Sequence, residues 1–193
     1  MRDHLPETFL VLSCYSVPQV APFPRPELQY TRDMITGEVP TVRHAARVAL
    51  FDENGRMLLA RFEYGGKTWW AAPGGGLERA ETHEEAARRE LREETGLDLQ
   101  NLGPWIWTRE HVFRFEGCLY RQKERYFLAT VPVFQPDSKL LSPEEASVLR
   151  GLRWWTVAEL EETADELAPA DLPALAKELV ENGPPPGPIE VGA

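Results

Sequence analysis

Three acidic side chains on one predicted helix are the strongest chemical signal in this sequence. Glu90, Glu93 and Glu94 lie in the segment 75–97, GGLERAETHEEAARRELREETGL. At about 100° per residue, a helix would point their carboxylates within roughly 60° of one direction. Like charges this close destabilise a bare helix by ~0.2–0.5 kcal/mol per pair, and a bound divalent cation would remove that repulsion. The spacing therefore predicts a metal-binding face.

An exposed helix with surface ion pairs is the alternative interpretation. Glu84 lies four residues before Arg88, a favourable spacing for an ion pair. This accounts for the back of the helix. It does not account for the front, where three carboxylates share one side with Ala86 and Ala87. We expect these small alanines to leave room for a metal ion and a phosphate group.

The glycine run 74–76 comes fifteen residues before Glu90 and has a separate role. Glycine lets the backbone approach a ligand closely and adopt angles that are closed to other residues. Together, the glycines and the carboxylates suit a metal-dependent reaction of a phosphate-containing ligand. In such a site, a divalent metal neutralises phosphoryl oxygens, orients the phosphates and lowers the pKa of a bound water.

The segment resembles the signature box of the Nudix hydrolases, G-x5-E-x7-R-E-L-x-E-E-x-G-L, without a departure. The matching positions are Gly75, Glu81, Arg89, Glu90, Leu91, Glu93, Glu94, Gly96 and Leu97. The resemblance extends over the compact part of the chain, including 71–76 and 154–160. It implies a Nudix-type α/β/α sandwich with a mixed central β-sheet. It also implies Mg²⁺-dependent hydrolysis of a nucleoside diphosphate linked to another moiety, with Mn²⁺ as a substitute.

The resemblance also assigns roles to residues. It makes metal ligands of Glu90, Glu93, Glu94 and the Gly75 backbone carbonyl. Glu93 and Glu94 would thereby act in catalysis, with Arg89 orienting the carboxylates. Glu81 would steady the junction of loop and helix, or reach the metal through water.

A catalytic base or further metal ligand often comes from outside the box in this family. Glu144 and Glu145 are the candidates here, because they precede the predicted strand that contains Trp154 and Trp155. An exposed acidic loop is the alternative for both.

Substrate phosphates need positive charge, and the arginine fork suits them. Arg47, Arg61 and Arg125 are the candidate substrate-binding residues. The alternative for each of them is an ordinary surface charge.

Composition limits the class of protein. The chain has 193 residues, 42% of them hydrophobic and 27% charged, which is typical of a globular protein. Its formal charge of −10 argues against broad binding to DNA or to an anionic membrane. The resemblance implies a small nucleotide-type substrate instead. Cys14 and Cys118 have no metal-ligand or disulfide pattern around them, which fits a reduced, cytoplasmic compartment.

The pattern of elements predicts three parts. A proline-rich arm spans 1–41, the Nudix domain spans 42–182, and a disordered tail spans 183–193. Within the domain, Asn54-Gly55 predicts a hairpin turn between two strands, 42–52 and 56–62. Further strands are expected at 69–72, 105–115, 119–133 and 151–156, with helices at 82–95, 157–163 and 171–181. The arm suggests a possible homodimer.

A rival interpretation is a regulatory protein of Nudix fold that senses a nucleotide derivative without cleaving it. Such regulators typically have an eroded box and an added basic DNA-binding module. Here the box is intact, and the tail lacks the pattern of a recognition helix. We therefore expect a metal-dependent pyrophosphohydrolase.

Overall fold

The computed structural model describes residues 38–115, 117–137, 141 and 146–192. Most of the expected N-terminal arm, Cys14 and both candidate bases, Glu144 and Glu145, lie outside these residues. Within them, no helix has the length and apolar character needed to cross a membrane.

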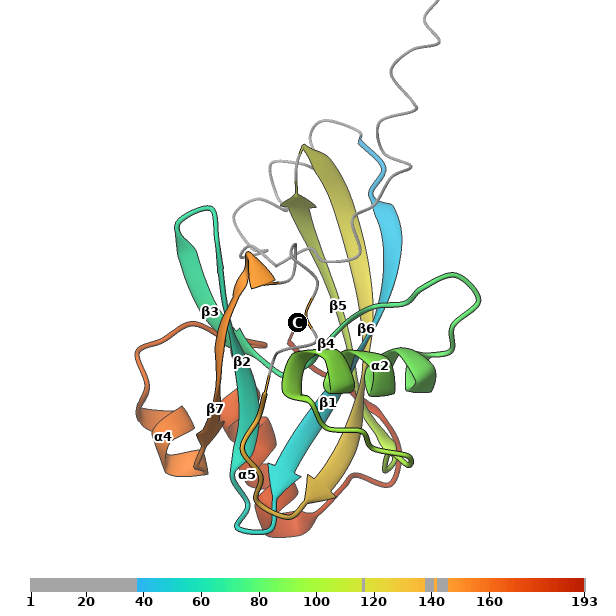
Figure 1. The fold of residues 1–193 in the computed structure, drawn as a ribbon. Helices are drawn as coiled ribbons and strands as arrows, with labels where there is room; N and C mark the ends of the chain where they lie inside the picture. Colours follow the sequence, from blue (N-terminus) through green and yellow to red (C-terminus); the bar gives the residue numbers. More distant parts are fainter. Residues whose placement is uncertain (1–37, 116, 138–140, 142–145, 193) are drawn as a thin grey trace, which may run out of the picture.

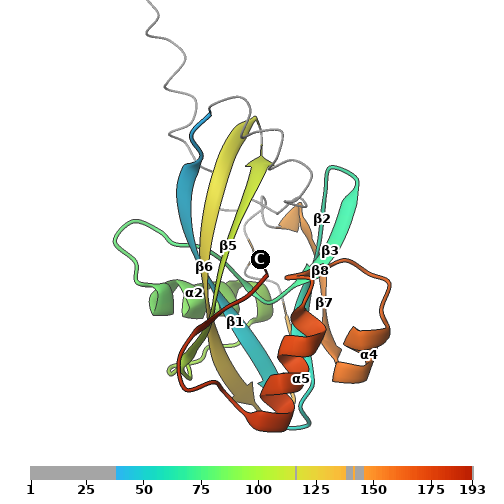
Figure 2. The ribbon, with the colours of Figure 1, turned by 180° about the vertical axis from the view of Figure 1, so that it is seen from behind.

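The described residues form one nine-stranded mixed sheet with helices on both faces (Figure 1, Figure 2). Its strands are β1 Thr41–Asp52, β2 Met57–Tyr64, β3 Lys67–Ala71, β4 Gly74–Gly76, β5 Trp105–Phe115, β6 Cys118–Val131, β7 Leu149–Trp155, β8 Leu167–Ala168 and β9 Ile189–Glu190. Its helices are α2 His83–Thr95, α4 Val157–Glu162 and α5 Leu172–Asn182. β1 pairs with β6 in parallel and with β2 and β4 antiparallel. The predicted α/β/α sandwich with a mixed sheet is confirmed.

The two faces of the central strands differ in what covers them. On the α2 face, β1 residues Ala46 and Val48 pack in one cluster with Leu91 of α2. On the opposite face, called the α5 face here, Ala49 of β1 packs in a cluster that contains Leu172 of α5. Because side chains alternate along a strand, every second residue of β1, β5 and β6 points to the α5 face.

The predicted hairpin and helix signals are confirmed. Gly55 has φ 73°, and the Asp52 side chain accepts the backbone N–H of Asn54, which closes the turn between β1 and β2. Thr82 caps α2 through a capping box with Glu85. At the other end, Gly96 adopts φ 75° and donates its N–H to the Arg92 carbonyl.

The role that we expected for the small alanines of α2 is wrong. Ala86 and Ala87 are fully buried, and they pack against β1 and β6 in the cluster that contains Ala46 and Phe127. A short side chain at these positions lets the helix axis approach the sheet closely. Their size therefore serves helix packing, and the carboxylates depend on that packing for their position.

The expectation of a disordered tail also differs from the structure. Ile189 and Glu190 pair with Trp107 and Thr108 as a parallel strand on the edge of β5. Val191 is 7% exposed and belongs to the α5-face core. Composition indicated disorder because the tail is rich in proline and glycine, but the free edge of β5 and an apolar site for Val191 order it.

Candidate active site

The carboxylate helix lies directly against the glycine strand. The Gly74 N–H donates to Glu94 Oε2 at 2.8 Å. A Cβ atom on Gly75 would lie 2.5 Å from Glu90 Oε1, closer than real Cβ contacts allow. Glycine is therefore required at position 75 because the Glu90 carboxylate occupies the space that a side chain would fill.

Arg89 connects the acidic residues to one another and to the glycine strand. Its Nε lies 2.9 Å from Glu81 Oε1, and its Nη2 lies 2.9 Å from the Gly76 carbonyl oxygen. Its Nη1 contacts both Glu90 Oε1 at 2.9 Å and Glu93 Oε2 at 3.1 Å. One guanidinium thus holds three of the box carboxylates around the carbonyl of Gly76.

The charges in this cluster stabilise one another. Burial opposes the charge of Arg89, but hydrogen bonding to Glu81 and the charge of Glu90 outweigh burial and raise the pKa of Arg89. Burial also opposes ionisation of Glu81, yet the Arg89 hydrogen bond and the Glu78 N–H lower its pKa below the usual range. Glu81 is therefore a carboxylate at neutral pH, as an acceptor between the loop and the helix must be.

The three proposed metal ligands differ in exposure. Glu90 and Glu94 are 4% and 5% exposed, whereas the Glu93 side chain is 26% exposed. Within the part of the chain that the structure describes, no three His, Cys, Asp or Glu side chains converge at metal-ligand spacing. The reason is that Arg89 lies against Glu90 and Glu93, while Gly74 holds Glu94. The donors are nonetheless all oxygen atoms on one helix face, the chemistry that a hard divalent cation prefers.

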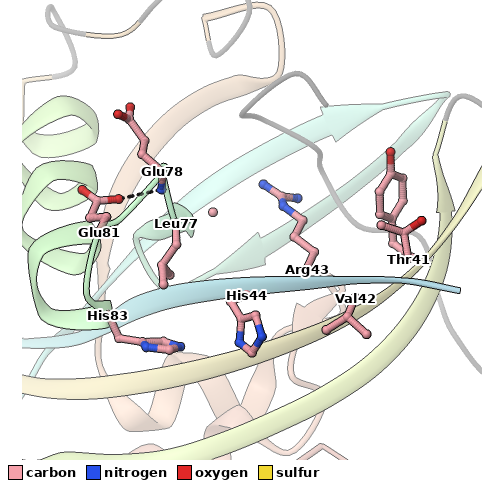
Figure 3. Close-up of a pocket in the computed structure, with 10 residues that line it drawn as sticks. Thr41, Val42, Arg43, His44, Leu77, Glu78, Glu81 and His83 are labelled. Carbon is pink, nitrogen blue, oxygen red and sulfur yellow. Dashed lines mark hydrogen bonds between the residues drawn. The ribbon is translucent and has the colours of Figure 1, made fainter. Parts of the chain in front are cut away.

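A pocket of about 540 Å³ adjoins this cluster at the first residues of β1 and the loop before α2 (Figure 3). Glu81, Gly76 and Tyr120 are among its lining residues, as are Arg43 and His44. The last two point to opposite sides of β1. The His44 ring meets the His83 ring edge to face, with 5.7 Å between centroids.

Arg47, one of the three predicted substrate arginines, has a different position from the one we expected. It is 2% exposed, and its Nε lies 2.6 Å from Glu124 Oε1. Its Nη1 donates to the carbonyl oxygens of Ala72 and Gly74 at 2.8 and 3.2 Å. Arg47 therefore anchors the glycine strand from the α5 face.

The other two predicted arginines also lie away from the lining of the pocket. Arg125 is stacked over Trp105, with its Cζ 4.2 Å from the ring centroid. Arg61 is exposed on β2, opposite Trp70 of β3. Of the described residues that line the pocket, Arg43 is the arginine. Arg43 and Arg47 are an even number of residues apart on one strand, which could have indicated that the two arginines share the α5 face.

A buried polar network lies deeper on the α5 face, around Glu124 of β6. Glu124 is 0% exposed, and it accepts hydrogen bonds from Arg47, Arg109, Gln122 and Tyr126. Burial opposes its ionisation, but the charges of Arg47 and Arg109 outweigh burial and hold the pKa of Glu124 below its usual range. Sequence reasoning missed this network, because a single Glu in a strand carries no signal of burial.

Comparison with known proteins identifies relatives of this chain and of its fold. The family model described as the NUDIX domain matches residues 41–177. An RNA pyrophosphohydrolase of Marinomonas sp. is 33% identical over 119 residues, covering 55% of this chain and 71% of that protein. An RNA pyrophosphohydrolase of Teredinibacter turnerae is 38% identical over 78 residues, covering 40% of this chain and only 45% of that protein.

A solved structure shows the same fold. The MutT protein of Methanosarcina mazei superposes with a TM-score of 0.59 at 16% identity, covering 76% of this chain and 100% of that one. At this identity the likeness concerns the fold alone. The match to the family model covers well over half of the chain, and the box runs from the glycine strand β4 through the loop that contains Glu81 and along α2 to Gly96 and Leu97 just beyond its end. This chain belongs to the Nudix hydrolase family.

Proposed function

We propose that this protein hydrolyses the pyrophosphate bond of a nucleoside di- or triphosphate derivative, with a divalent metal ion as cofactor. One observation carries the proposal. Arg89 gathers Glu81, Glu90 and Glu93 around the Gly76 carbonyl, and Gly76 and Glu81 also line the pocket. The acidic cluster and the cavity thus share two residues.

Glu90, Glu93 and Glu94, with the Gly75 carbonyl, would hold the metal ion, which we infer to be Mg²⁺ with Mn²⁺ as a substitute. When bound, such an ion neutralises phosphoryl oxygens and lowers the pKa of a water molecule. Arg89 serves as a positioning residue, because its contacts fix the carboxylates relative to the glycine strand. Glu144 and Glu145 remain the proposed candidates for a base.

Arg43 is the proposed phosphate contact. Its Nη2 would lie 2.8 Å from a Cβ on Gly76, so the guanidinium rests on bare backbone at the pocket. The chain has a formal charge of −10, so a polyphosphate needs such a local cation. Arg61 and Arg125 remain secondary proposals, since both lie outside the lining of the pocket.

The names of two relatives support a proposal for the substrate class. Both are named RNA pyrophosphohydrolases, which suggests the 5′-triphosphate end of RNA as a candidate beside free nucleoside triphosphates. In both candidate substrates, the cleaved bond lies in a 5′-polyphosphate attached to a nucleoside.

The test is phosphate and pyrophosphate release from a panel of compounds, with Mg²⁺ or Mn²⁺ and with EDTA. The panel contains nucleoside triphosphates, ADP-ribose, NADH, sugar nucleotides, dinucleoside polyphosphates, coenzyme A and 5′-triphosphate RNA. Metal-dependent cleavage of one class would support the proposal and identify the substrate. Binding of one compound without cleavage would favour a sensing role instead.

A cytoplasmic location and a homodimer are further proposals. The two cysteines without disulfide context motivate the first, and the proline-rich arm motivates the second. Light scattering over a hundredfold range of concentration tests the dimer. A monomer mass at every concentration would exclude it.

A further inference from the structure

The α5 face of β6 carries a buried amide that the proposed hydrolysis does not use. Gln122 is 0% exposed, and it lies directly between Arg43 of β1 and His111 of β5 in the pairing of the strands. The preceding residue on this face, Tyr120, lines the pocket and lies opposite Phe113 of β5. Gln122 is therefore one step deeper than the lining of the pocket.

Glu124 fixes the orientation of this amide. Gln122 Nε2 donates to Glu124 Oε1 at 2.8 Å. Glu124 also accepts from Arg47 and Arg109, so it is a carboxylate that offers only acceptors. A flipped Gln122 amide would place its oxygen against the carboxylate. Gln122 Nε2 therefore faces Glu124, and Gln122 Oε1 points away from the carboxylate.

Gln122 Oε1 is buried and has no hydrogen-bond partner among the residues that the structure describes. Buried acceptors are nearly always paired, because an unpaired one loses its hydration without compensation. The described side chains supply no donor to this oxygen, so a bound ligand or a buried water molecule must supply one. A ligand would reach this oxygen by displacing the Arg43 side chain. The Arg43 guanidinium is the far end of a long, flexible group that reaches Gly76.

Aromatic side chains lie on the same face beside the amide, buried against one another. The Phe113 and Tyr120 rings are stacked with 5.6 Å between centroids, and His111 is stacked on Phe113 at 5.4 Å. Flat aromatic surfaces bind the π-face of a nucleobase, while a fixed acceptor binds a donor on its edge. Exocyclic amino groups are such donors in adenine, cytosine and guanine.

We propose that Gln122 determines base specificity, its Oε1 accepting a hydrogen bond from the exocyclic amino group of the substrate nucleobase. The substrates would then be nucleotides of adenine, cytosine or guanine, in preference to those of uracil or hypoxanthine. This inference rests on the proposed function. The polyphosphate would extend from the base past Arg43 towards the glycine strand and the carboxylate helix.

The test compares kcat/KM within two pairs, ATP against ITP and CTP against UTP. The same pairs are presented as the first nucleotide of 5′-triphosphate oligoribonucleotides. The wild type is expected to prefer the amino-bearing member by about tenfold to a hundredfold, because the other member leaves the acceptor unpaired. In Gln122→Met the ratio is expected to fall towards one. Gln100→Met, at an exposed glutamine, is the matched control and should keep the wild-type ratio.

Ratios within one variant are independent of its folded fraction, so a purely structural role for Gln122 would leave them unchanged. Such a result, or equal rates within the pairs for the wild type, would overturn the inference. If Gln122→Met fails to fold, the wild-type ratios decide alone. Cleavage without base preference leaves the proposed hydrolase intact. Absence of cleavage of every compound in the full panel would overturn both proposals.

Discussion

The backbone N–H of Gly74 donates to the Glu94 carboxylate across a separation of twenty residues in the chain. The bond joins the start of β4 to the last turn of α2. Glu94 is 5% exposed, so this contact has little competition from water. A proposed metal ligand is therefore also a structural link, and the two roles can be separated by experiment.

Glu94→Gln should separate them. The amide keeps an oxygen for the Gly74 N–H, so the melting temperature should change by only a few degrees. It removes the negative charge that a divalent cation needs, so kcat should fall by about a hundredfold or more. The measurements are steady-state kinetics with Mg²⁺ and thermal unfolding. Glu84→Gln, at an exposed position on the same helix, is the control and should retain wild-type kcat. Equal activity of Glu94→Gln and the wild type would refute the assignment of Glu94 as a ligand.

Gly75→Ala should displace Glu90. The new Cβ would lie within 2.8 Å of both carboxylate oxygens, so the side chain or the strand must move. Overpacking of this kind costs about 1–3 kcal/mol of unfolding free energy. We expect a decrease in the unfolding free energy, measured by denaturant unfolding, and a decrease in kcat. Gly187→Ala is the control, since a Cβ there meets nothing within 4 Å. The double variant Gly75→Ala, Glu90→Asp shortens the side chain that clashes with the new Cβ, so it should recover part of the lost stability. If it does not, the clash is not with Glu90.

Arg89→Lys tests whether one guanidinium is needed to join the acids. Lysine keeps the charge, but a single ammonium cannot span Glu81, Glu93 and the Gly76 carbonyl together. We expect a loss of about 1–3 kcal/mol of unfolding free energy and a lower kcat. Arg88→Lys is the control, because Arg88 makes an exposed hydrogen bond to the Gln100 carbonyl. If both variants behave alike, the positioning role of Arg89 is wrong.

The sequence predicted the parts of the site that depend on local spacing. The capping box of Thr82 and Glu85 and the stop at Gly96 follow from local capping signals, and the structure has both. The stripe predicted for Glu90, Glu93 and Glu94 follows from helical periodicity, and in the structure Glu90 and Glu94 are buried while the Glu93 side chain is 26% exposed. The fold class followed from the box and from the order of strands and helices. Such features need only a few neighbouring residues to be recognised.

The features that the sequence did not predict depend on contacts between distant segments. Arg47 was expected at the substrate, but its partner Glu124 is 77 residues away, and only the parallel pairing of β1 with β6 brings them together. The position of Arg43 at the pocket needs the same pairing. Val191 is ordered because β5 offers an edge to the tail. Propensity and composition contain none of this information.

The free energy of unfolding should decrease as the pH is lowered, because of His111. Burial lowers the pKa of His111 to about 3, with Arg109, Arg47 and Arg43 acting in the same direction and Glu124 opposing them. In the unfolded chain the pKa of His111 has its usual value near 6.5. Below that pH the unfolded chain therefore binds a proton that the folded protein does not bind. The contribution is fully present above pH ~6.5 and is lost as the pH falls towards 3.

His111→Gln should therefore flatten the decline in melting temperature between pH 7.5 and 5.5. In this range most carboxylates are ionised in both states, so the histidine contribution can be seen. His44→Gln, at an exposed histidine, is the matched control and should decline as the wild type does. Parallel curves for His111→Gln and the wild type would mean that folding does not lower the pKa of His111.

The packing of the tail can be tested by two substitutions in or next to β9. Val191 is 7% exposed within the α5-face core, whereas Ile189 is 44% exposed. Removing buried methyl groups costs both transfer free energy and a cavity, so Val191→Ala should lower the unfolding free energy by about 1–2 kcal/mol. Ile189→Ala should cost clearly less, although it removes more carbon atoms, because much of that side chain remains in water. Denaturant unfolding at constant pH measures both. Small and equal losses would show that the tail is detached in solution, and that β5 has a free edge.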